Sequence, residues 1–80
     1  RVERMKDDLE LFLEDFQPPP VREWNGTMID KFYREWFVEH ANPTDDDRLS
    51  MRETMLHLIQ FLKDKKLLGV DFSPNILQET

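Results

Sequence analysis

Apolar residues recur three or four positions apart in three stretches of the chain, and residues that interrupt helices separate these stretches. The interruptions are three consecutive prolines at 18–20, Asn-Pro at 42–43, and Gly69. A proline ring removes a backbone donor and clashes with the preceding turn, so the prolines predict a rigid elbow between helices rather than an exposed recognition ligand. No stretch alternates with the two-residue period of a strand. The pattern therefore predicts an all-α fold, a small three- to four-helix bundle with helices over about 2–16, 27–41 and 45–68.

The first stretch has a single apolar face. On a wheel of 100° per residue its apolar side chains fall within an arc of about 100°, and Leu11 stands alone on the opposite side. This arrangement is typical of a peripheral helix that buries one face. The face comprises Val2, Met5, Leu9, Phe12, Leu13 and Phe16.

The second stretch holds four of the nine aromatic residues. We expect Thr27 to cap its first turn, with Asp30 completing a capping box. Its apolar arc spans about 180° of the wheel, which is too wide for contact with one neighbour. Either two helices flank it, as is usual in a bundle, or one edge stays open for a partner. The arc comprises Met28, Ile29, Phe32, Tyr33, Trp36 and Phe37.

The third stretch offers two overlapping capping boxes, which begin at Thr44 and at Ser50. We favour Thr44, because Leu49 continues the apolar pattern upstream of the second box. Gly69 suits the left-handed position that follows a helix, so we expect the helix to run to Leu68. The main apolar stripe is Met51, Met55, Leu58, Ile59 and Leu62, and a second line is Leu49, Leu56 and Leu67.

The residues after Gly69 resemble the start of another helix. Ser73 is a favourable N-cap and Pro74 a favourable first helical residue, so a fourth helix could begin at 74. Because the sequence stops soon afterwards and starts with Arg1 rather than Met, we expect 1–80 to be one helical domain from a longer protein. The predicted core is Phe12, Ile29, Tyr33, Trp36, Met55, Ile59 and Leu62.

Composition narrows the classes of function. The 80 residues carry a net charge of −6, from 17 acidic and 11 basic side chains, and contain no cysteine. Neither a disulfide nor a thiolate zinc site can form, and small secreted domains usually need disulfides, so we expect an intracellular, most simply cytoplasmic, location. An acidic surface repels phosphate backbones and anionic lipids. No apolar run approaches the roughly 20 residues needed to cross a bilayer.

No constellation of residues indicates chemistry. His40 and His57 lie outside any metal-ligand spacing, and we expect His40 to be hydrogen-bonded and partly buried. The aspartates at 45–47 lack the alternating ligands and glycine of a calcium loop, and they suit the positive end of a helix dipole. Two glycines leave no room for a phosphate-binding loop. We therefore predict no enzyme activity, and no catalytic, cofactor-binding or metal-binding residues.

The leading hypothesis is a helical protein–protein interaction or regulatory module without catalytic activity of its own. Aromatic residues and methionine are enriched in interface cores, and this chain has many of both. A protein partner or self-association would use the edge of the aromatic arc together with the second leucine line. The candidate contact residues are Trp36, Phe37, Leu49, Leu56 and Leu67.

Two alternatives remain open. Segment 52–69, in which Thr54 precedes an apolar pattern, resembles a helix of tyrosine-recombinase core-binding domains, and the resemblance implies a DNA-binding helical domain. The acidic balance of the chain opposes binding to a duplex. The third hypothesis is a structural role, as a spacer or dimerisation element.

Overall fold

The computed structural model describes the backbone of residues 2–77, and every regular element in that range is helical. The all-α prediction is confirmed, with three helices. The first consists of α1 (Val2–Glu10) and the π-helical η1 (Leu11–Phe16), the second of α2 (Gly26–Lys31), the π-helical η3 (Phe32–Trp36) and α3 (Phe37–Ala41), and the third is α4 (Asp45–Asp64). Two single 3₁₀ turns, η2 (Val21–Glu23) and η4 (Asn75–Leu77), complete the described elements.

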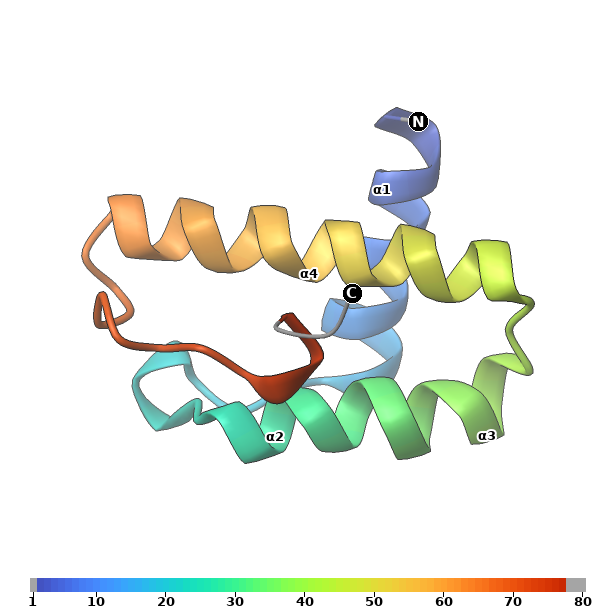
Figure 1. Cartoon of the computed structure of the whole chain (residues 1–80), viewed down its shortest axis with the longest axis horizontal. Helices are drawn as coiled ribbons and strands as arrows, with labels where there is room; N and C mark the ends of the chain where they lie inside the picture. The colour runs from blue at the N-terminus through green and yellow to red at the C-terminus, as the bar shows by residue number, and fades with distance from the viewer. Residues whose placement is uncertain (1, 78–80) are drawn as a thin grey trace.

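The second and third helices run antiparallel, and α1 crosses α4 at a steep angle (Figure 1). The segment that follows α4 turns back and places η4 against both α2 and α4. A fourth helix is not seen among the described residues: the chain makes only the turn η4 there, and the remainder of that prediction falls on 78–80, outside the described part.

The proline run is an elbow between the first and second helices. The indole N–H of Trp24 donates to the carbonyl of Pro19 at 2.7 Å. This hydrogen bond connects the residue that follows η2 to the middle of the proline run. The Trp24 ring also meets Phe12 edge-on, with 5.5 Å between centroids. The elbow is thereby fixed by the core rather than presented as a ligand.

The two predicted helix starts have different outcomes. Thr44 caps α4 as predicted: its hydroxyl accepts from the Asp47 N–H at 3.1 Å, and its own N–H donates to the Asp47 carboxylate at 2.9 Å. Thr27 is not the cap of α2. Asn25 takes that position, two residues before Thr27, and its side chain accepts from the Met28 N–H at 2.8 Å.

The predicted end of the third helix is wrong by four residues. α4 ends at Asp64, and Lys66 rather than Gly69 adopts the left-handed conformation, with φ 62°. The Leu67 N–H donates to the Leu62 carbonyl and the Lys66 N–H to the Lys63 carbonyl, at 2.8 and 2.9 Å, which is the Schellman pattern. The early turn brings Leu68 back into the core.

A π turn decides which aromatic residues of the second helix are buried. The Phe37 N–H donates to the carbonyl of Phe32, five residues earlier, so these two side chains share a face that a wheel of 3.6 residues per turn would separate. Phe37 is only 3% exposed, whereas Tyr33 and Trp36 are partly buried, which corrects their prediction as core residues. Of the predicted core, Phe12, Ile29, Met55, Ile59 and Leu62 are confirmed.

The face that the first helix buries is rotated from the predicted one. Asp8 faces α4, and Leu13, predicted to be buried, is 47% exposed. Leu11, predicted to lie on the outer side, packs against the core. Leu11 and Leu13 both lie in the π-helical η1, whose wider turn changes the face that each residue occupies, and a wheel of 3.6 residues per turn does not represent it. The observed core is Phe12, Trp24, Ile29, Phe32, Phe37, Met51, Met55, Ile59, Leu62, Leu68 and Ile76.

The segment after α4 completes this core. Ile76 is fully buried, and Pro74 lies against Gly26, where an added Cβ would sit 3.4 Å from the Pro74 Cα. The Asp30 carboxylate, predicted to serve a capping box, instead accepts from the N–H groups of Asn75 and Ile76 at 3.1 and 3.0 Å. The turn η4 is therefore capped by a residue 45 positions earlier in the chain.

Candidate partner-binding groove

A polar contact holds α1 against α4 where the two helices cross. The Asp8 carboxylate accepts from the hydroxyls of Ser50 and Thr54, at 2.6 and 3.0 Å. Thr54 is 1% exposed, so its hydroxyl is shielded from water and has the Asp8 carboxylate as its hydrogen-bond acceptor. On the first helix Met5 and Leu9, to either side of Asp8 in the sequence, are partly buried.

An open apolar cavity of about 300 Å³ lies at this edge. Met5 and Leu9 contribute its α1 side, and the α4 side comes from the second half of that helix. Phe61, the largest of these side chains, is 55% exposed and has the Lys65 Nζ 5.6 Å from its ring centroid. The lining residues are Met5, Leu9, Thr54, His57, Leu58 and Phe61.

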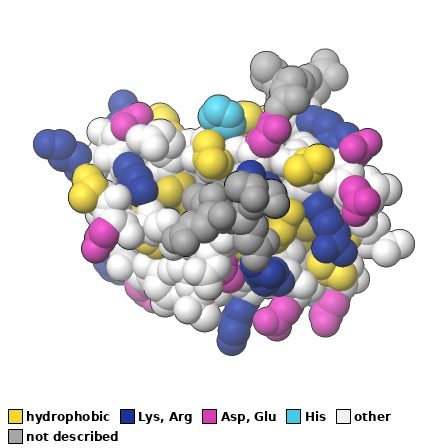
Figure 2. All heavy atoms as spheres, viewed as in Figure 1, with side chains coloured by type: hydrophobic (Ala, Val, Ile, Leu, Met, Phe, Trp, Pro, Cys, Tyr) yellow, Lys and Arg dark blue, Asp and Glu magenta, His cyan; other side chains and the backbone are white. Residues whose placement is uncertain are grey.

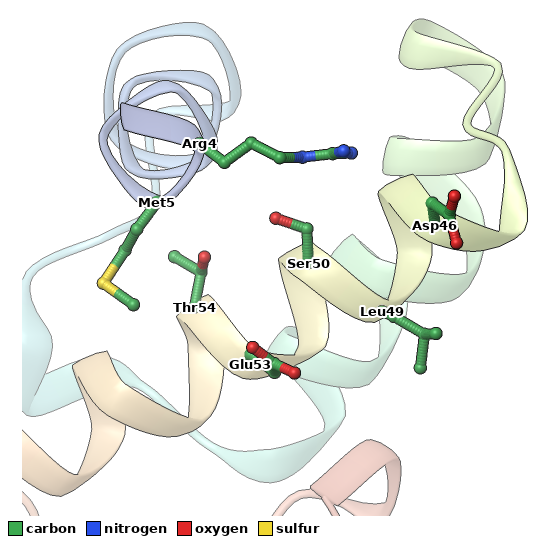
Figure 3. Close-up of a pocket in the computed structure, with 7 residues that line it drawn as sticks. All are labelled: Arg4, Met5, Asp46, Leu49, Ser50, Glu53 and Thr54. Atoms are coloured by element: carbon green, nitrogen blue, oxygen red, sulfur yellow. The ribbon is translucent and has the colours of Figure 1, made fainter. Parts of the chain in front are cut away.

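A second cavity, of about 270 Å³, lies at the beginning of α4 and is rich in charged side chains. Figure 3 shows Arg4 reaching from α1 towards the first turns of α4, with the Ser50 and Thr54 side chains on the side of α4 that faces α1. Met5 and Thr54 line both cavities, so the two are halves of one depression, here called the α1/α4 groove. The second half is lined by Arg4, Met5, Asp46, Leu49, Ser50, Glu53 and Thr54.

The charged half of the groove carries side chains of both signs. Arg4 forms a salt bridge with Asp47, Asp46 and Glu53 belong to the lining, and Asp8 lies behind the two hydroxyls. The Thr44 N–H bonded to the Asp47 carboxylate is the main cause that holds the Asp47 pKa below its ordinary value, and Arg4 adds to it. The helix dipole contributes about half a positive charge here.

Three of the predicted contact residues are exposed leucines. Leu49, Leu56 and Leu67 are 58%, 42% and 56% exposed. Leu49 lines the charged half of the groove, although its side chain extends away from α1 (Figure 3). Leu56 lines neither half, and Leu67 follows the end of α4, so it does not continue a helical line with the other two.

The two predicted aromatic contacts do not join these leucines. Phe37 is buried in the core, because the π turn rotates it there, and it is not available to a partner. Trp36 is partly buried between Phe16 and His40, with its ring stacked 4.3 Å from the imidazole. His40 is exposed rather than partly buried, and its Nδ1 donates to the Trp36 carbonyl at 2.9 Å.

Four residues that line the apolar half are absent from the predicted contact residues: Met5, Leu9, His57 and Phe61. The apolar pattern predicts Met5 and Leu9 on a buried face, and their spacing of four gives no sign that a steep crossing would leave their outer edges accessible. His57 and Phe61 are also four apart on α4, and this pairing across from Met5 and Leu9 was the only available signal.

The face that carries the C-terminal segment offers no comparable apolar surface among the described residues. Figure 2 shows its hydrophobic side chains as separate small areas with charged side chains between them. The residues that the structure describes contain no cluster of three or more potential metal ligands. None of the helices formed by these residues has the length and apolar character needed to span a membrane. No protein-family model, curated protein or solved structure matches this chain.

Proposed function

We propose that this chain is a helical protein–protein interaction module without catalytic activity of its own, and that it binds its partner through the α1/α4 groove. The observation that carries the proposal is the apolar half of the groove, where a phenylalanine, a methionine and two leucines line a cavity open to solvent. Apolar residues around an accessible depression are the usual centre of an interface.

Each half of the groove is small. The two volumes are about 300 and 270 Å³, at and just below the lower limit of the roughly 300–1,000 Å³ in which small-molecule pockets fall. Each half has room for one or two side chains. A protruding side chain of a partner would gain free energy by leaving water there, at about 25 cal/mol per Å² of apolar surface.

A selection of displayed helical peptides against the intact chain tests this proposal. We expect the selected peptides to share an apolar anchor and to lose at least about fivefold in affinity for a Phe61→Ala variant, because removing the ring removes one wall of the cavity. Leu56→Ala is the matched control: it truncates an exposed side chain of α4 outside the groove, and affinity should stay unchanged.

The alternative functions predict other results. A DNA-binding domain would bind duplex DNA with an affinity that falls steeply with added salt. The net charge of −6 opposes such binding. A dimerisation element would show concentration-dependent sedimentation with no peptide present. Duplex binding, or peptides that bind equally well to the Phe61→Ala variant, would refute the proposed function.

A further inference from the structure

Asn25 and Gly26 form the only asparagine–glycine pair in the chain. A backbone nitrogen that follows an asparagine can attack the side-chain amide carbon and close a five-membered ring, and glycine has no side chain to hinder the approach. The other two asparagines are less suited, because Asn42 precedes a proline without an N–H and Asn75 precedes a β-branched isoleucine. Asn25 is exposed, so water reaches its side chain. Sequence and exposure therefore single out Asn25 for this chemistry.

The folded structure holds the pair in a geometry that opposes ring closure. The Asn25 side-chain oxygen accepts from the Met28 N–H at 2.8 Å, as the cap of α2, and the Asn25 backbone has ψ 168°. At this ψ the Gly26 nitrogen is staggered relative to the Asn25 Cβ, whereas a five-membered ring needs the two nearly eclipsed. Ring closure thus requires rotation about the Asn25 Cα–C bond and loss of the cap hydrogen bond.

The segment that follows α4 restricts the same rotation. Gly26 lies so close to the fully buried Pro74 that an added Cβ would be 3.4 Å from the Pro74 Cα. Asp30, one turn further along α2, accepts from the N–H groups of Asn75 and Ile76 at 3.1 and 3.0 Å. The peptide that precedes Gly26 therefore has little room to turn while residues 74–76 are in place. Local opening of that segment supplies the room.

We propose that Asn25 is a site of deamidation, and that the contact between the start of α2 and residues 74–76 controls its rate. In the first step a bond forms between the Gly26 nitrogen and the Asn25 Cγ, the Cγ–Nδ2 bond breaks, and ammonia leaves with the proton that the Gly26 N–H gave up. Water then adds to one of the two carbonyl carbons of the cyclic imide, which gives aspartate or isoaspartate at position 25. Water is the only co-reactant, and nothing is oxidised or reduced.

The two products differ in their effect on the fold. Aspartate keeps a side-chain oxygen that can accept from the Met28 N–H. Isoaspartate lengthens the main chain by one carbon before Gly26 and shortens the side chain, so the cap and the fit of Gly26 against Pro74 are lost. Formation of isoaspartate thereby converts a transient opening of the C-terminal segment into a lasting one.

The test compares the intact chain in native buffer with the same chain in urea, at one temperature and one mildly alkaline pH. Mass spectrometry of peptides follows conversion at position 25, and chromatography separates the isoaspartate peptide from the aspartate peptide. We expect conversion to be at least about fivefold slower in the folded chain, because the cap hydrogen bond must be lost first. Asn42 and Asn75 are internal controls and should stay unchanged over the same period.

Two matched variants identify the contact responsible. Asp30→Ala removes the acceptor of two N–H groups in the segment 74–76, and Asp8→Ala removes the acceptor of two hydroxyls on the other side of α4. With urea added until both variants are equally stable, we expect Asp30→Ala to convert at least about threefold faster than Asp8→Ala. If circular dichroism shows Asp30→Ala to be unfolded, Asp30→Asn takes its place, since it retains one acceptor oxygen.

Each part of the proposal has an outcome that would overturn it. Absence of conversion in urea would remove the site, and equal rates in native buffer and in urea would show that folding does not control it. Equal rates in the two variants at matched stability would assign the protection to the whole fold rather than to residues 74–76. The isoaspartate form should unfold at lower urea than the Asn25→Asp variant, and equal stability of the two would refute the lasting opening.

Discussion

Two of the contacts that α4 makes differ in how completely they bury the side chains between them. On one side the segment around Ile76 fits between α2 and α4, with the Ile76 side chain fully buried. Its backbone is satisfied as well: Asp30 accepts from its N–H groups, and the Arg52 Nε donates to the Ile76 carbonyl at 2.9 Å. On the other side α1 meets α4 through Asp8 and two hydroxyls, and apolar side chains remain exposed beside them.

The difference shows how a small domain leaves surface for a partner without losing its fold. A short segment outside the long helices can follow the shape between two helices, and the Ile76 side chain is fully buried there. A straight helix that crosses another at a steep angle touches it over a short length. Side chains on either side of the crossing are then not covered by the other helix. In this protein such side chains line the α1/α4 groove.

Truncation of one apolar residue on each side should give the largest contrast. Ile76→Ala is expected to lower the free energy of unfolding by about 2–4 kcal/mol, because the cavity left in a closed contact cannot collapse fully. Phe61→Ala removes a larger side chain that is 55% exposed and should cost less than about 1 kcal/mol. Urea denaturation of both variants measures the two values. If Ile76→Ala and Phe61→Ala lower the free energy of unfolding equally, the two contacts do not differ in how completely they are buried.

The turn that leads from α4 into the closed contact should be open to improvement. Lys66 holds a left-handed conformation, so Lys66→Gly is expected to raise the free energy of unfolding by about 0.5–1 kcal/mol. Lys65→Gly, at a neighbouring residue with φ −85°, is the control and should be neutral or destabilising. Thermal unfolding followed by circular dichroism measures both. A stabilising Lys65→Gly, or a destabilising Lys66→Gly, would argue against the Schellman turn.

The smallest expected effect is on the pH dependence of the free energy of unfolding, through Asp47 at the start of α4. The Thr44 N–H, with Arg4, lowers the pKa of Asp47 in the folded state below its ordinary value of 3.8. A carboxyl with a lowered pKa stabilises the fold fully above its unfolded pKa and loses this contribution as pH falls through the folded value.

Asp47→Asn should therefore weaken the fall in stability below about pH 4, while the variant is less stable than the parent at neutral pH. Urea titrations at pH 7 and at pH 3 measure the difference. Asp15→Asn, at an exposed residue of η1, is the matched control and should follow the parent. Parallel curves for Asp47→Asn and the parent would show that this carboxylate has no part in the pH dependence.

Much of the local structure could be read from the sequence, because it depends on residues close together in the chain. The proline run, the Asn-Pro break and the capping box at Thr44 act through backbone donors and sterics over a few positions, so they set three helices and their approximate order. The main apolar stripe predicted for α4 is also confirmed, since this helix keeps a regular α-helical period throughout.

The tertiary structure alone decided the rest, because those features depend on contacts between distant residues. Phe37 is buried through a π turn that lets both Phe32 and Phe37 reach the core. Asp30 caps η4 because the chain folds back on α2, and Lys66 takes a strained conformation so that Leu68 can return to the core. The groove has the same origin: its two walls are more than 40 residues apart in sequence, and only the angle at which α1 crosses α4 leaves Met5, Leu9 and Phe61 accessible.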